Sequence, residues 1–568
     1  MLGRLLPALQ WPRPSRSTIS HDLVAGISVS LLAVPQSLAY AQLAGVPAYY
    51  GLYAALIPSV VGVLFGSSAI LSTGPVAMTS LLTAASAGHF AIPGSEQFIA
   101  YVMLLALMSG MFQIGLGLAR AGVLLNLLSH PVLMGFINAV ALIIALAQLP
   151  AMTGIPNPQT EHFLADTWDL LSRIGSTHVM SVVFGALAMA LLFAFRRYAP
   201  KLPGVLISVA AVTWCSYYFD FAVHGGQVIG IVPAGLPSFS TPAFSWNAIV
   251  ALLPAAFVIA LISFMEAMSS CKIIAIRTRT RWDENQELIG QGLAKIAAAF
   301  CHSMPVSGSF SRSALNLSSG GRTGVSSLVA AGFVLLTLLF LTPLLYHLPK
   351  PALAAMIILA VAGLVDVRAM RNAWLASRDD GTAAGATFIA TLVFAPNIQN
   401  GLLTGIIISL GAFIYRRMSP RVVMVGPHPD GTFRDVERFK LAPLHRAIAA
   451  LRFDASLFFA NVSFFEDAVL KLERGNPDLK FIMIVANGIN HLDASAVEML
   501  RALTQRMREC GITLVLSGAK KQVLEVMQRT GLLSEFGEAN VFGSDRLALE
   551  ALLVRVGEGT ASNGPGSD

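Results

Sequence analysis

Two charged residues stand in apolar surroundings within the first three-quarters of the chain. Glu266 lies in the run ALLPAAFVIALISFMEAMSS, and Arg312 follows MPVSGSFS. An apolar environment favours the protonated form of a carboxyl group unless a cation faces it. A lone arginine in such an environment should face a cavity or a partner. Glu266 is therefore a candidate proton carrier, and Arg312 is a candidate source of positive potential for an anion. A permanent ion pair between Glu266 and an arginine is the structural alternative.

Two polar residues follow Pro35 in the first apolar run. Gln36 and Tyr40 are four positions apart, so a helix would place them on one face. Both can donate hydrogen bonds to a bound oxyanion. Buried polar side chains that tie helices together are an equally ordinary explanation of this pair.

Two short segments interrupted by Gly and Pro could present such an anion with backbone donors. LSTGPVAMTSLLTAAS begins a helix at Pro75, and MPVSGSFSRSALNLSS begins another near Pro305. Matching interrupted segments in two halves of a membrane protein point to a binding site at the middle of the bilayer. A helix N-terminus offers free N–H groups and positive dipole potential. The pair is typical of an anion site, although ordinary re-entrant loops or kinked helices would show the same pattern.

The composition places these segments in a membrane. The chain has 568 residues, of which 55% are hydrophobic and only 12% are charged, and its mean hydropathy is +0.68. Soluble domains carry about 25% charged residues. Half of the charged residues lie from Arg421 onward, so the last quarter alone has soluble composition. Apolar runs long enough to span a bilayer cover 22–44, 97–118, 124–149, 247–275 and 324–345. We expect about fourteen segments between 20 and 418.

The loop charges predict the orientation. With a cytoplasmic N-terminus, the loops predicted to face outside carry only Arg173 and Lys350, whereas the inside loops carry most of the basic residues. This asymmetry follows the positive-inside rule. An even number of spans then leaves both the arm at 1–19 and the C-terminal region in the cytoplasm. Nucleic acid is not needed to explain the basic excess.

The sequence lacks the motifs that would indicate an ATP-driven pump, a metalloenzyme or a thiol redox protein. There is no GxxxxGK[ST] loop for an ATP-driven pump, and no HExxH or clustered metal-binding motif in the apolar part. The four cysteines form no CxxC pair. We therefore expect no enzyme activity, no metal and no cofactor.

The run PQSLAYAQLAGVPAYYGLYAALIPSVVGVLFGSS at 35–68 resembles the signature of the sulfate permease (SulP) family. STGPVAMTS, MPVSGSFSRSALN and LISFMEAMSS match that family as well. The resemblance implies fourteen helical segments built as two inverted repeats of seven. A core of segments 1–4 and 8–11 would move against a gate of segments 5–7 and 12–14, and the protein would be a homodimer.

The resemblance also implies where the substrate binds, between the starts of segments 3 and 10. With the polar residues above, it gives the substrate-binding residues Gln36, Tyr40, Thr73, Gly74, Pro75, Val76, Ser309, Phe310, Ser311 and Arg312. Ser72, Thr79 and Asn316 are weaker candidates. Glu266 matches a position that goes with coupling to protons or sodium.

The C-terminal region has the pattern of an α/β domain. Short apolar runs such as FIMIVANGI and TLVLSGA are each followed by a helical pattern. The stretch from Gly488 to Leu532 resembles a STAS domain, which we place at 421–556, with a disordered tail at 557–568. Phosphorylated relatives have Asp-Ser-Ser-Gly where this chain has Asp493-Ala494-Ser495-Ala496, so phosphorylation at the position of Ala494 is not expected.

The sequence thus predicts a secondary anion transporter of the bacterial inner membrane, with proton-coupled symport of sulfate or a related anion as the leading hypothesis. The partners would be the anion, the proton, membrane lipid and a cytoplasmic partner of the STAS domain. Other mechanisms stay open: a sodium-coupled bicarbonate carrier, an anion exchanger or channel, a C4-dicarboxylate carrier, or an anion sensor that signals through STAS without transport.

Overall fold

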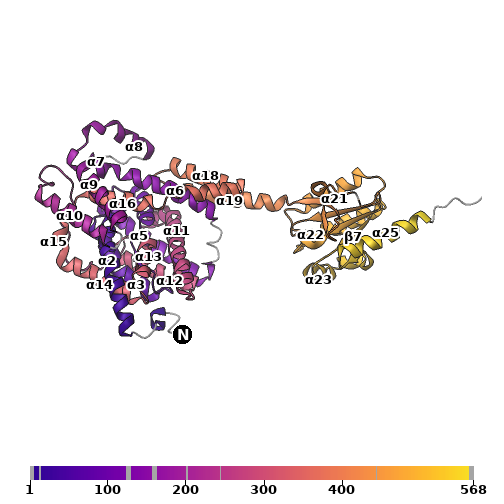
Figure 1. The fold of residues 1–568 in the computed structure, drawn as a ribbon, viewed down its shortest axis with the longest axis horizontal. Coiled ribbons are helices and arrows are strands. Elements are labelled where there is room, and N and C mark those ends of the chain that lie inside the picture. The colour runs from indigo at the N-terminus through magenta and orange to yellow at the C-terminus, as the bar shows by residue number, and fades with distance from the viewer. Residues whose placement is uncertain are drawn as a thin grey trace, which may run out of the picture. The chain divides into compact units, whose positions relative to one another are not determined.

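The computed structural model describes residues 6–11, 15–122, 129–155, 163–199, 202–242, 245–442 and 444–561. It divides into two compact units, Met1–Ser409 and Leu410–Asp568. The first is a bundle of helices, and the second is a sheet flanked by helices (Figure 1).

The described part of the helical region contains fourteen principal helices, seven in each half of the sequence. Those of the first half are α2 (Arg16–Leu43), α3 (Tyr49–Phe65), α4 (Ala77–Gly88), α5 (Glu96–Leu118), α6 (His130–Ala147), α9 (Val179–Tyr198) and α10 (Gly204–Tyr218). Those of the second half are α11 (Trp246–Thr278), α12 (Glu284–Phe300), α13 (Phe310–Ser318), α14 (Val325–Leu336), α16 (Lys350–Ala362), α18 (Arg378–Val393) and α19 (Ile398–Met418).

Shorter elements connect or extend these helices. They are η1 (Pro7–Gln10), α7 (Leu149–Thr153), α8 (Phe163–Ser172), η3 (Ile174–Ser176), η4 (Thr337–Leu341), α15 (Thr342–Leu345) and α17 (Val367–Ala376). Two two-residue strands, β1 (Thr73–Gly74) and β2 (Ser307–Gly308), interrupt the bundle.

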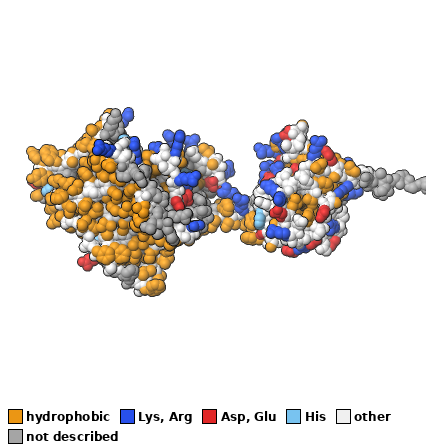
Figure 2. All heavy atoms as spheres, turned by 90° about the horizontal axis from the view of Figure 1, so that it is seen from below, with side chains coloured by type: hydrophobic (Ala, Val, Ile, Leu, Met, Phe, Trp, Pro, Cys, Tyr) orange, Lys and Arg blue, Asp and Glu red, His pale blue; other side chains and the backbone are white. Residues whose placement is uncertain are grey.

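The helical unit has the surface of a membrane protein. Within the described ranges, eight helical stretches are long and apolar enough to cross a bilayer. Large apolar side chains such as Phe193, Phe340 and Ile407 are exposed on them, and Figure 2 shows hydrophobic side chains over much of this unit. The predicted membrane region is confirmed.

The packing of the helices repeats between the two halves. Helix α2 packs against α14, and α11, its counterpart in the second half, packs against α5. In the same way, α6 packs against α18, and α16 packs against α9. Helices α2–α5 and α11–α14 contact mainly one another, whereas α6, α9, α16 and α18 form a second group. This grouping is the predicted division into a core and a gate.

The second unit is an α/β domain with a sheet in the order β4-β3-β5-β6-β7-β8. Strands β5 to β8 are parallel, and β3 and β4 are antiparallel to their neighbours. The strands are β3 (Val422–Pro427), β4 (Phe433–Asp435), β5 (Ile448–Phe453), β6 (Phe481–Val485), β7 (Thr513–Ser517) and β8 (Val541–Phe542). Its helices are α20 (Val436–Phe439), α21 (Val462–Gly475), η5 (Ala486–Gly488), α22 (Ala494–Glu509), α23 (Lys521–Arg529), α24 (Leu532–Phe536), η6 (Glu538–Asn540) and α25 (Asp545–Ala561).

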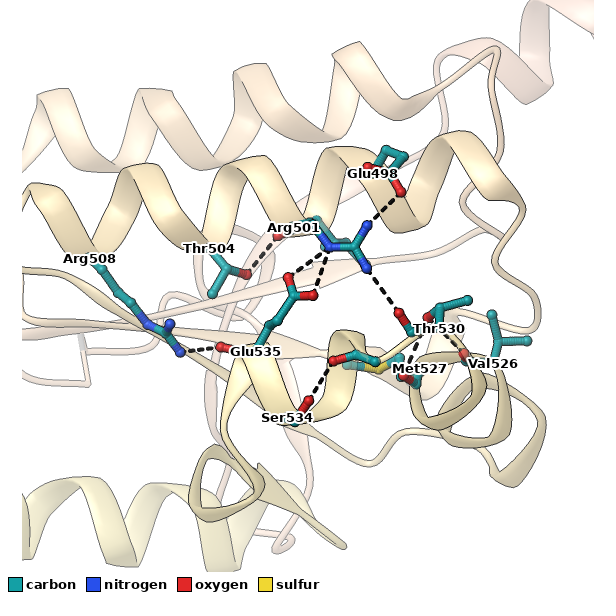
Figure 3. A network of polar contacts seen from close by, with 11 residues as sticks. Glu498, Arg501, Thr504, Arg508, Val526, Met527, Thr530, Ser534 and Glu535 are labelled. Atoms are coloured by element: carbon teal, nitrogen blue, oxygen red, sulfur yellow. Dashed lines mark hydrogen bonds and ion pairs between the residues drawn. The ribbon is translucent and has the colours of Figure 1, made fainter.

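One arginine joins three parts of this domain. The guanidinium of Arg501 on α22 donates to both carboxylate oxygens of Glu535 on α24, at 2.9 and 2.7 Å, and to the backbone oxygen of Thr530, at 2.9 Å (Figure 3). It also donates to Glu498 within α22, at 2.6 Å. Arg501 therefore fixes α24 and the end of α23 against α22.

The domain boundaries expected from the sequence differ from the helix ends in two places. Helix α2 begins at Arg16, because Ser15 caps it by accepting from the backbone N–H of Thr18, so it includes the end of the expected arm at 1–19. Helix α25 runs to Ala561, past the expected start of the tail at 557, and Ala548, Leu552 and Val556 bury one face of its earlier turns against the sheet. Residues 562–568 lie outside the described residues.

Candidate anion-binding site

The two interrupted segments meet at a short antiparallel crossing. Thr73 pairs with Gly308, and Gly74 pairs with Ser307. The backbone N–H of Ser309 extends the crossing by donating to the carbonyl oxygen of Ser72, at 2.8 Å. Each strand leads directly into a short helix, α4 after β1 and α13 after β2. Segments separated by more than 200 residues thus present two helix N-termini beside one crossing.

The helix starts leave backbone donors free. The first turn of a helix has N–H groups without an intrahelical partner. Val76 precedes α4 and gives it no side-chain cap, whereas Ser309 caps α13 by accepting from the backbone N–H of Arg312, at 3.4 Å. The first turn of α4 can therefore donate to a negatively charged ligand.

Arg312 brings a guanidinium to the crossing. Its side chain is 1% exposed, and within the described residues neither Nη1 nor Nη2 has a hydrogen-bond partner. Nη2 lies only 2.8 Å from the position that a Cβ at Gly74 would occupy. A buried cation is stable only if its charge and donors are compensated. A bound oxyanion would supply that compensation at this position.

Tyr40 links this cation to Glu266. Tyr40 is 6% exposed on α2, and it interacts electrostatically with both Arg312 and Glu266. The carboxyl group of Glu266 on α11 interacts electrostatically with the side chain of Ser307 in β2. Its Oε2 atom is buried without a partner among the described residues. The structure therefore brings together the anion candidate and the proton candidate.

The other candidates fall into two groups. Thr73, Gly74, Pro75, Val76 and Ser309 are buried at the crossing. Thr73 Oγ1 is held by the amide of Gln291, at 2.9 Å. Gln36 is half-buried on α2, and its Oε1 atom is buried without a partner among the described residues. Phe310 and Ser311, by contrast, are exposed at the start of α13, because the first turn of this helix turns Arg312 and Ser313 inward.

The charge pairs of the structure bear on the alternative of a permanent ion pair between Glu266 and an arginine. No ion pair joins Arg312 to Glu266 among the residues that the structure describes. The cation that acts on the carboxylate of Glu266 is Lys295 on α12. Lys295 is fully buried, and its Nζ atom donates to Gln113 Oε1, at 2.8 Å.

Sequence reasoning missed Lys295, Gln113 and Gln291. Glu287, Gln291 and Lys295 are four apart, so the sequence places them on one face of α12, but this spacing does not tell that the face is buried. All three are buried there. No group of three or more metal-binding side chains occurs within the described ranges.

Comparisons with known proteins agree over nearly the whole length. The model of the sulfate permease family matches residues 19–387, and that of the STAS domain matches residues 440–546. The chain is 32% identical to "Sulfate transporter 4.1, chloroplastic" of Arabidopsis thaliana, over 94% of this chain and 81% of the plant protein. It is 30% identical to "Probable sulfate transporter MT1781" of Mycobacterium tuberculosis, over 96% of this chain and 98% of that protein.

Solved structures share the fold. The murine anion transporter Slc26a9, in an inward-facing state, superposes with a TM-score of 0.90 at 21% identity, covering 97% of this chain and 94% of that chain. The transmembrane domain of the cyanobacterial bicarbonate transporter BicA superposes with a TM-score of 0.59 at 21% identity, covering 69% of this chain and 98% of that one. These matches, with the crossing and the C-terminal domain, establish that the chain belongs to the sulfate permease family of anion transporters and carries a STAS domain.

Proposed function

We propose that this protein is a secondary carrier that takes up sulfate, or a related small anion, together with a proton. The observation that carries the proposal is the placement of Arg312 and Glu266 beside one strand crossing, with Tyr40 in electrostatic contact with both. An anion near Arg312 adds negative charge close to Glu266 and so favours its protonation. Thermodynamic linkage requires that protonation favours anion binding in return.

The binding step uses groups that the fold holds in place. The guanidinium of Arg312 and the free N–H groups at the start of α4 donate to the oxyanion, and Tyr40 adds a hydroxyl group. The gate helices then move against the core so that the site opens to one side at a time. Helices of the core contact one another more than they contact the gate, which supports such a rigid-body movement.

The cellular setting belongs to the same proposal. The protein acts in the bacterial inner membrane with both termini in the cytoplasm, because basic residues gather at the ends of α9, α11 and α19. These are the sixth, eighth and fourteenth principal helices, so all three end inside if the N-terminus is cytoplasmic. It forms a homodimer, and its STAS domain takes a cytoplasmic partner.

Uptake into proteoliposomes tests the proposal. Radiolabelled sulfate should accumulate above its external concentration when a proton gradient is imposed, and the accumulation should collapse with a protonophore. A sodium gradient alone should not drive it. Accumulation of sulfate with sodium alone would mean coupling to sodium. Sodium-driven accumulation of bicarbonate in the same vesicles would favour the bicarbonate carrier, which the fold shared with BicA would also fit.

The remaining mechanisms give different results in the same vesicles. An exchanger requires a second anion inside, a channel equilibrates sulfate without concentrating it, and a sensor binds sulfate without flux. Competition by bicarbonate, chloride and a C4-dicarboxylate identifies the transported anion.

A further inference from the structure

A buried polar chain leads from the crossing to a second cation. Ser307 Oγ of β2 donates to the backbone oxygen of Ser263 on α11, at 2.6 Å. The amide of Gln113 on α5 donates to Ser263 Oγ, at 3.0 Å, and to the backbone oxygen of Ala260, at 2.8 Å. Gln113 Oε1 then accepts from Lys295 Nζ, at 2.8 Å. Each residue that contributes a side chain to this series of hydrogen bonds is at most 1% exposed.

Helix packing alone does not require this lysine. Gly110 of α5 and Gly292 of α12 bring the two backbones so close that a Cβ at either glycine would lie 2.7 Å from the carbonyl oxygen of the other. Helices α5 and α12 therefore pack closely beside Lys295 without any contribution from its side chain. A buried charge is costly, and an apolar side chain of similar length would fill the same space at lower cost.

The charges around Lys295 pair it with Glu266. Lys295 and Glu266 act on each other electrostatically. The other carboxylate on α12, Glu287, is held elsewhere: it accepts from the backbone N–H groups of Ser67 and Ser68, at 2.9 and 3.0 Å, and from Gln291. Tyr40 interacts electrostatically with both Glu266 and Arg312, and Cys271 interacts with Glu287.

We infer that Lys295 is the second positive charge of the anion site and that it makes the carrier select a doubly charged anion. The inference rests on the proposed proton coupling at Glu266. With Glu266 ionised, one of the two cations is balanced by its carboxylate. When Glu266 takes up a proton, the positive charges of Arg312 and Lys295 together balance the two charges of one dianion. Lys295 is a positioning residue, since it acts on the anion through Glu266 and through the electric field of its own charge.

Sulfate and perchlorate test this charge count, because both are tetrahedral oxyanions and only sulfate is doubly charged. The full-length purified carrier is equilibrated with radiolabelled sulfate, which is displaced by unlabelled sulfate or by perchlorate at several pH values. The ratio of the two dissociation constants is compared in wild type, Lys295→Gln and Lys295→Arg. Glutamine keeps a donor for Gln113 Oε1 and removes the charge, whereas arginine keeps the charge.

Lys295→Gln should shift the ratio toward perchlorate by about tenfold, which corresponds to about 1.4 kcal/mol, because the dianion loses more electrostatic attraction than the monoanion when one unit charge is removed. Lys295→Arg should restore most of the preference for sulfate. An equal loss for both anions, or an unchanged ratio, in folded Lys295→Gln would make the lysine structural. If that variant does not fold, wild type decides: perchlorate binding at least as tight as sulfate binding would overturn the inference.

The experiment separates this inference from the proposed function. Equilibrium binding needs no proton gradient, so the ratio can shift in Lys295→Gln even if wild-type uptake proves independent of protons. In that case the proposed coupling at Glu266 is contradicted, whereas the role of Lys295 as a second positive charge is supported. If uptake is driven by protons but the ratio of the two dissociation constants is unchanged in Lys295→Gln, the proposed coupling is supported and the role of Lys295 as a second positive charge is contradicted.

Discussion

In the proposed anion site, Arg312 is the single side chain that brings a full positive charge to a neutral crossing of two strands. Its guanidinium is 1% exposed, and its two terminal nitrogens have no partner among the described residues. The free N–H groups at the start of α4 add to its field. The arginine provides the larger part of the attraction, because a full charge acts where the helix end supplies about half of one.

Arg312→Ala should therefore weaken anion binding by about 1.5–3 kcal/mol, which is the range for hydrogen bonds to charged groups and corresponds to about 10- to 150-fold in affinity. Arg312→Lys should recover part of the loss, since it keeps the charge and loses the paired donors. Arg196→Ala is the control, because Arg196 is exposed at the end of α9. Equal affinities for Arg312→Ala and Arg196→Ala would mean that Arg312 serves the structure only.

The residue scale also shows which part of the site was predictable. Glu266 and Arg312 were identified because each interrupts an apolar or small-residue stretch. Lys295 was missed because α12 also carries Glu284, Glu287 and Gln291, so its sequence looks like that of a surface helix. Only the packing of α12 against α3 and α5 buries these side chains. The burial of Lys295 is a tertiary effect that local sequence does not contain.

The crossing of β1 and β2 depends on glycine at the point of closest approach. Gly74 has a φ of +156°, which residues with side chains rarely adopt, and its α-hydrogens face Nη2 of Arg312. Interrupted segments could be recognised from Gly and Pro in the sequence. Their pairing could not be derived from those residues alone, because it joins positions more than 200 residues apart.

Gly74→Ala should reduce anion affinity about three- to tenfold while leaving the protein folded. The added methyl group displaces the flexible end of Arg312, and the backbone strain of about 1–3 kcal/mol is borne at one position. Gly88→Ala, at the other end of α4, is the matched control, because a Cβ there meets no atom within 4 Å. Sulfate displacement on both variants measures the effect. Unchanged affinity in Gly74→Ala would separate the guanidinium from the binding site.

In the STAS domain, α24 should depend on Arg501. Its guanidinium holds Glu535 and the backbone of Thr530 (Figure 3), and these contacts are partly exposed, so Arg501→Ala should cost only about 1–2 kcal/mol. Amide hydrogen exchange on the full chain should show faster exchange in α24 and at the end of α23. Arg546→Ala, which removes an exposed pair with Glu550 on α25, is the control. Protection of α24 that is equal in the two variants would contradict this role.

At the scale of the whole molecule, the two halves of the helical region repeat the same packing, as the pairs α2–α14 and α5–α11 illustrate. The long apolar runs were predicted from hydropathy, and their ends agree with the helices within a few residues, except that α2 starts earlier and α6 starts at His130. The core and gate were expected from the family resemblance, because hydropathy alone does not reveal which helices contact each other.

Orientation is the prediction at this scale. In a cysteine-free background, a cysteine in place of Asp430 should be protected from an impermeant thiol reagent applied outside. Cysteines in the described parts of the loops at 150–178 and 220–246 should react. The reason is the concentration of basic residues at the ends of α9 and α19, which the positive-inside rule places in the cytoplasm, and Asp430 follows α19 in the chain. Labelling of position 430 from outside intact cells would overturn the topology.

Glu266 carries the central claim, which is that anion uptake is coupled to a proton. Glu266→Gln mimics the protonated form, so it should still bind sulfate but should no longer respond to a proton gradient. The measurement is sulfate flux into proteoliposomes with and without an imposed inward proton gradient, in wild type and in Glu266→Gln. Wild type should concentrate sulfate only with the gradient, and the variant should equilibrate sulfate at the same rate in both conditions. A variant that still concentrates sulfate when the gradient is imposed would contradict the account.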